Sequence, residues 1–145
     1  MARLRAGSDM KFDISWSKVL FLPACLFFFS ELVAQLTNWY SAFPWIDIPM
    51  HLIGGFLAAI TLDEVFRFWR VRGYLAKFHP LLEILFLTSL VVVIAVFWEF
   101  HEFLRDTIFY THFQISQGDT MHDLLMGMTG GLFASCLLQG KKKKM

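Results

Sequence analysis

Apolar residues fall in four long blocks along this chain, separated by short polar stretches. A helix rises about 1.5 Å per residue, so about 20 residues cross the roughly 30 Å hydrocarbon core of a bilayer. The blocks predict transmembrane helices over residues 18–38, 45–68, 80–104 and 119–139. The connections between them are short, which favours antiparallel neighbours. We therefore expect an all-α fold, a polytopic membrane protein whose four-transmembrane-helix bundle is a single membrane domain over residues 1–145.

Positively charged residues predict the direction of these helices. Of the 13 Lys and Arg residues, all except Arg105 lie before or at the start of the first block, at the end of the second block or between it and the third, or in segment 140–145. Cytoplasmic loops of membrane proteins carry such an excess of Lys and Arg. We expect both termini to be cytoplasmic (N-in/C-in), residues 140–145 to form a basic cytoplasmic tail, and the protein to be a multi-pass protein of the inner or plasma membrane.

The composition supports a membrane protein and excludes one class of partner. Hydrophobic residues make up 57% of the chain and charged residues 17%, which is more apolar surface than a soluble domain of this length can bury. The lipid bilayer is therefore an expected partner. The net charge is only +1, and the basic residues flank apolar blocks without forming one basic face, so we expect no nucleic-acid binding.

Acidic and histidine residues cluster at one end of the second, third and fourth predicted helices. Residues three or four apart share a face of a helix, so Asp47 aligns with His51 and Asp119 with Asp123. Ionisable groups at membrane depth are costly in lipid, normally face the bundle interior, and mark functional sites. These clustered acidic and histidine residues all lie toward the predicted outer face of the membrane. The candidate site residues are Asp47, His51, Glu99, Glu102, Asp119 and Asp123, with His122 as an alternative ligand.

Glycines on the same helices indicate how these groups would meet. Gly55 shares a face with His51, and Gly127 and Gly130 continue the face of Asp123. Small residues at this spacing let helix backbones approach closely in membranes. Docking along these faces would bring the carboxylates together in one pocket. Exposed glycine-rich faces could equally form contacts between two copies of the chain, so whether the protein is a homo-oligomer stays an open question.

Three motifs carry a resemblance to a known family: the run from Asp47 to Gly55, the run Trp98-Glu99-Phe-His-Glu102, and the run from Gly118 to Gly131 with its aspartates four residues apart. The chain resembles the YjdF-like inner-membrane proteins of bacteria and, more distantly, VanZ-like proteins. The resemblance implies a polytopic membrane fold with these acidic and histidine positions. It implies no activity, because the activity of that family is unassigned, and YjdF-like proteins have more helices than the four expected here.

Several functions fit these residues. Carboxylates with an imidazole suit Mg²⁺, Mn²⁺, Zn²⁺ or Fe as a divalent metal cofactor. A metal that activates water could support hydrolysis or group transfer on a lipid headgroup or similar amphiphile, so whether the chain is an enzyme stays open. One alternative is a proton- or cation-coupled transporter. Against it, the cytoplasmic half of the predicted helices offers only three acidic residues, Asp63, Glu64 and Glu83. Another is a structural or partner-binding protein held together by interhelical hydrogen bonds.

Overall fold

The computed structural model describes residues 22–37 and 42–144, and the regular structure within these ranges is entirely helical. Its elements are α1 (Leu22–Thr37), the short 3-10 helix η2 (Pro44–Ile46), α3 (Asp47–Val71), α4 (Pro80–Phe109) and α5 (Gln117–Lys144). Three helices in the described ranges, α3, α4 and α5, are long and apolar enough to cross a membrane. α1 has 16 described residues. The start of the first predicted span, residues 18–21, and the basic segment before it lie outside the described residues.

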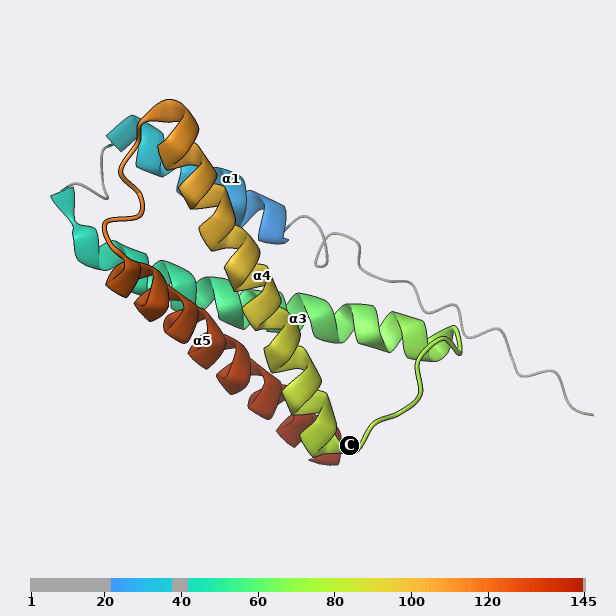
Figure 1. Cartoon of the computed structure of the whole chain (residues 1–145). Coiled ribbons are helices and arrows are strands. Elements are labelled where there is room, and N and C mark those ends of the chain that lie inside the picture. The colour runs from blue at the N-terminus through green and yellow to red at the C-terminus, as the bar shows by residue number, and fades with distance from the viewer. Residues whose placement is uncertain (1–21, 38–41, 145) are drawn as a thin grey trace, which may run out of the picture.

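The three spanning helices pack against one another, while α1 lies beside α3. α3 and α5 share the largest helix–helix contact, followed by α4 and α5. α4 runs opposite to α3 and α5, which run in the same general direction (Figure 1). The starts of α3 and α5 therefore meet the end of α4, and we call this the site end of the bundle. The opposite end, where Glu83 and Lys142 lie, is the tail end.

Local chemistry explains where the helices begin and end. α3 is followed by Gly73 at φ 77°, in the left-handed region that glycine adopts without strain. α4 begins at Pro80, and the Nδ1 atom of His79 accepts a hydrogen bond from the backbone N–H of Leu81 at 3.3 Å. α4 and α5 both extend beyond the predicted spans 80–104 and 119–139. The predicted spans end just before charged residues, but Arg and Lys are good helix formers, so Arg105 and the lysines of α5 continue the helices.

The contact between α3 and α5 is formed by backbone against backbone. A Cβ atom on Gly55 would overlap the carbonyl group of Gly127, and one on Gly130 would overlap the carbonyl group of Leu52. A Cβ atom on Gly131 would meet the side chain of Val91 on α4. These contacts confirm the predicted docking of the glycine-bearing faces, because no residue with a side chain could occupy the same positions at this separation.

A compact ionic cluster joins the three spanning helices at the tail end. The Nζ atom of Lys142 lies 2.6 Å from Asp63 Oδ1 and 2.6 Å from Glu83 Oε1, and Arg70 Nη2 lies 2.8 Å from Glu83 Oε2. Asp63 and Glu83 are 4% and 3% exposed. Two carboxylates thus face two cations, and each helix supplies at least one of the four groups. The lysine-rich end of α5 is therefore part of the packed bundle as far as Lys142.

Candidate functional site

The structure brings six of the sequence-predicted site residues together at the site end. Asp47 and His51 come from the first turns of α3, Glu99 and Glu102 from the second half of α4, and Asp119 and Asp123 from the start of α5. They form three overlapping sets whose potential ligand atoms lie within 4.8 Å of one another. We call these six residues the acidic cluster. Its three sets are Asp47 with His51 and Glu102, His51 with Glu99 and Asp123, and Asp47 with Asp119 and Asp123.

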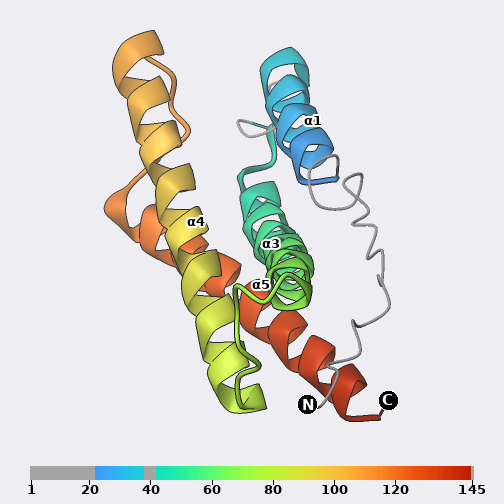
Figure 2. The ribbon, with the colours of Figure 1, turned by 90° about the vertical axis from the view of Figure 1, so that its right-hand side faces the viewer.

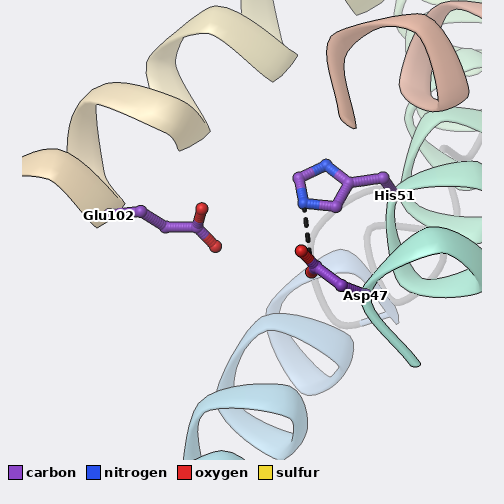
Figure 3. A group of neighbouring side chains, drawn as sticks. All are labelled: Asp47, His51 and Glu102. Atoms are coloured by element: carbon purple, nitrogen blue, oxygen red, sulfur yellow. Dashed lines mark ion pairs between the residues drawn. The ribbon is translucent and has the colours of Figure 1, made fainter. Parts of the chain in front are cut away.

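His51 lies at the centre of this cluster. Its Nε2 atom is 3.4 Å from Asp47 Oδ1 and 3.9 Å from Glu99 Oε1. Figure 3 shows the carboxylate of Glu102 reaching from α4 toward His51 and Asp47 on α3. The side chains of His51 and Glu99 are only 8% and 7% exposed. Acidic groups that lie this deep need a cation, a proton or hydrogen-bond donors to offset their charge.

Two side chains outside the predicted set hold the glutamates in place. The indole Nε1–H of Trp98 donates to Glu102 Oε1 at 2.8 Å. The side-chain amide of Gln114 donates to Glu99 Oε2 at 3.1 Å. The other carboxylate oxygen of Glu99, Oε1, is buried and has no hydrogen-bond partner among the described residues. One acceptor aimed at His51 is therefore left available for a ligand.

Asp106 organises the loop between α4 and α5 instead of joining the cluster. Helical spacing places it on the face of Glu99 and Glu102, but its carboxylate accepts hydrogen bonds from the loop. The donors are the hydroxyl of Thr111 at 2.6 Å and the backbone N–H groups of Phe113 and Gln114, both at 2.9 Å. Through this loop, Asp106 positions the side chain of Gln114 against Glu99.

Replacing Asp106 by Ala should loosen this loop without unfolding the helices. A hydrogen bond to a charged acceptor contributes about 1.5–3 kcal/mol, so amide hydrogen exchange at Phe113 and Gln114 should accelerate by roughly tenfold or more. Hydrogen-exchange mass spectrometry in nanodiscs measures this effect. Thr107→Ala, which removes only a hydroxyl bonded to the Phe103 carbonyl within the same helix, is the matched control. Equal exchange in both variants would contradict the role of Asp106.

The remaining polar residues near the site play other parts. His122 belongs to none of the three sets within the described ranges, and its role as an alternative ligand stays a prediction. The ring of His101 lies 5.6 Å from that of Trp98. Sequence patterns gave no signal for Gln114, because a loop amide is common and acquires a role only through its contacts. Trp98 begins the motif Trp98-Glu99-Phe-His-Glu102, but the sequence did not indicate that its indole would hold Glu102.

The donor set of the cluster suits a divalent cation. Carboxylate oxygens and imidazole nitrogens bind such ions at about 2.0–2.6 Å, so two ligands on opposite sides of one ion are about 4–5 Å apart. The separations of up to 4.8 Å in each set fit this geometry. The starts of α3 and α5 also direct the positive ends of their helix dipoles toward Asp47 and Asp119, which favours ionised carboxylates there.

Comparison with known proteins places the whole chain in a family. No curated protein and no solved structure matches the chain. A family model described as "Predicted membrane protein (DUF2238)" matches residues 5–144, a stretch that includes α1, α3, α4, α5 and every residue of the acidic cluster. The membrane character expected from the apolar blocks agrees with this description. The chain therefore belongs to the DUF2238 family of membrane proteins.

Proposed function

We propose that this membrane protein binds one divalent metal ion in the acidic cluster and uses it on the headgroup of a lipid or similar amphiphile. The ligands are drawn from Asp47, His51, Glu99, Glu102, Asp119 and Asp123, and the candidate ions are Mg²⁺, Mn²⁺, Zn²⁺ and Fe. The observation that carries the proposal is Glu99 Oε1. This buried carboxylate oxygen faces His51 and has no hydrogen-bond partner among the described residues.

A bound cation accounts for two features that hydrogen bonding alone leaves unexplained. An unsatisfied buried acceptor destabilises a fold by about 1–3 kcal/mol, and more when it is charged. Carboxylates gathered within a few ångströms also repel one another in a low-dielectric interior. A divalent ion between Glu99, Asp123 and His51 removes both penalties at once. Such an ion polarises coordinated water and headgroup oxygens, which supports hydrolysis or group transfer.

The proposed topology places this chemistry near the outer face of the cell membrane. We propose that the segment containing α1 is a fourth span and that both termini are cytoplasmic, because the basic residues flank the ends of the spans that lie away from the acidic cluster. We also propose that the chain is similar to the YjdF-like proteins. The site end of α3, α4 and α5 then faces the periplasm, from which a metal ion reaches the cluster.

Elemental analysis of the detergent-purified protein tests the metal site. We expect one divalent ion per chain in the native protein, and loss of that ion in Glu99→Gln and Asp123→Asn, each of which removes one charged ligand. Loss of a single ligand should weaken metal binding by about 100-fold or more, since even residues behind the ligands contribute 10–100-fold. Glu64→Gln is the matched control, because Glu64 pairs with Arg67 at 2.9 Å outside the cluster. Native protein without metal after incubation with each candidate ion would refute the proposal.

The transport alternative has less support. The acidic cluster and the ionic cluster at the tail end are separated by the apolar core of Ala59, Val91 and Ala134, which are each at most 1% exposed. In sequence, each of these residues lies between the two clusters on its own helix. A proton or cation crossing the bundle needs polar groups along this interval. The buried face of α3 there consists of Gly55 and Ala59, and the buried hydroxyls of Thr88 on α4 and Ser135 on α5 are not ionisable.

A further inference from the structure

An apolar cavity of about 590 Å³ lies between α1, α3 and α4. Figure 2 shows α1 and α4 on either side of α3. The walls of the cavity include Leu26 and Val33 of α1, Leu57 and Ala58 of α3, and Ala95 of α4. Pockets that hold drug-sized ligands have volumes of roughly 300–1,000 Å³, so the cavity has room for a substantial apolar group.

The mouth of the cavity is apolar and lies in the membrane-spanning part of the protein. Phe29, Ile53 and Ile94 line it and are 65%, 50% and 45% exposed. Ile53 and Ile94 belong to α3 and α4, which are long and apolar enough to cross a membrane, and Phe29 belongs to α1, which is part of the proposed fourth span. A ligand therefore enters from the bilayer, and the compounds present there at high concentration are lipids. Val91, by contrast, lines the cavity but is only 1% exposed, which marks its deep end.

One end of this cavity touches the acidic cluster. Asp47 and His51 line the cavity and also belong to the cluster, and Trp98 forms part of the wall while donating to Glu102. A molecule that fills the cavity with its apolar part thus presents its polar part to the metal ligands. Apolar walls with a few polar groups at one end are typical of sites that orient an amphiphile.

We propose that this cavity holds one hydrocarbon chain of a phosphate-bearing membrane lipid whose headgroup phosphate binds the divalent ion in the acidic cluster. The proposal rests on the metal site proposed above and names its substrate class. Carboxylate-bound Mg²⁺ and Mn²⁺ commonly complete their coordination with phosphate oxygens of a substrate. Without the cation, the carboxylates of Asp47 and Glu102 would repel a phosphate, so binding of the headgroup depends on metal.

Photolabelling in nanodiscs tests both halves of this proposal. The probe is phosphatidylglycerol with a diazirine on one acyl chain, and a diacylglycerol with the same chain serves as the phosphate-free probe. We expect phosphatidylglycerol to label Val91 and Ala58 several-fold more strongly with Mn²⁺ than with EDTA, as read by residue-level mass spectrometry. Labelling by diacylglycerol should not depend on Mn²⁺. Phe97 and Phe133, which are 69% and 61% exposed and lie outside the cavity lining, report ordinary contact with the bilayer.

A variant that fills the cavity provides the decisive comparison. Gly54 lines the cavity, and a Cβ atom built on it meets nothing within 4 Å, so Gly54→Leu should fold and occupy the space intended for the chain. Labelling of Val91 should be lost in this variant. Gly140→Leu is the matched control, because Gly140 is also surrounded by open space and lies outside the cavity lining. An unchanged thermal unfolding midpoint verifies that both variants fold.

The outcomes separate this proposal from the metal site on which it rests. Bound metal together with labelling confined to Phe97 and Phe133 overturns the lipid site and leaves the metal site standing. Labelling of Val91 by phosphatidylglycerol that is the same with Mn²⁺ and EDTA overturns the contact between phosphate and metal. A native protein that binds no metal in elemental analysis refutes the metal site itself, whatever the labelling pattern.

Discussion

Replacing Gly55 by Ala should lower the free energy of unfolding by about 3 kcal/mol, the upper end of the usual range for overpacking a well-packed contact. The added methyl group would overlap the backbone of Gly127. Backbone atoms cannot move aside as the end of a flexible side chain can, so α3 and α5 must separate along their whole contact. That separation would also displace His51 from Asp123, and we expect metal binding to fall with stability. Unfolding in detergent mixtures titrated with SDS measures the change.

Gly54→Ala is the matched control for this prediction. Gly54 precedes Gly55 on the same helix, but a Cβ atom on it meets nothing within 4 Å. Ala has a higher helix propensity than Gly by about 1 kcal/mol, so this variant should be as stable as the native protein or slightly more stable. If Gly55→Ala and Gly54→Ala behaved alike, the close backbone contact between α3 and α5 would be wrong.

Replacing Lys142 by Met should have an effect of similar size through a different cause. Lys142 neutralises the buried carboxylates of Asp63 and Glu83, and Glu83 retains Arg70 when Lys142 is removed, whereas Asp63 loses its cation. Removing one partner of a buried ion pair destabilises a protein by about 3–5 kcal/mol. We expect about 3 kcal/mol, the lower end of this range, because the Lys142 side chain is itself 31% exposed. The same SDS titration measures the loss.

Two further variants test whether the effect of Lys142→Met comes from the unpaired charge that it leaves on Asp63. Lys141→Met removes a neighbouring lysine that is exposed and should change stability by no more than about 0.5 kcal/mol. In the double variant Lys142→Met with Asp63→Asn, the uncompensated charge disappears, so part of the lost stability should return. A double variant less stable than Lys142→Met alone would show that Asp63 is neutralised in another way.

The two polar clusters have different characters although they lie on the same faces of the same helices. The tail-end cluster contains two carboxylates and two cations, and its ion pairs are between 2.6 and 2.8 Å long. The acidic cluster contains five carboxylates and one imidazole, that of His51, and one oxygen of Glu99 has no hydrogen-bond partner among the described residues. A balanced set of charges holds helices together, whereas an excess of ligand atoms favours a bound cation. This contrast is the reason to place the function at the site end.

The sequence by itself determined the helical membrane fold and the residues that meet at the site end. Blocks of about 20 apolar residues leave few alternatives to spanning helices. Lipid offers no hydrogen-bond partners, so the backbone N–H and C=O groups must pair within the helix. The spacing of Asp47 and His51, and of Asp119 and Asp123, fixes a shared helix face through local geometry alone. Since isolated charges are costly at membrane depth, these faces had to point inward.

Only the tertiary structure decided which partner each of the other polar groups took. Asp106 turns to the loop, Gln114 reaches back to Glu99, and Lys142 pairs with Asp63, 79 residues away in sequence. Helical spacing cannot indicate such contacts, because they depend on how far each helix continues and on the angle at which it packs. The cavity between α1, α3 and α4 arises in the same way, as space left between helices whose separation no local pattern encodes.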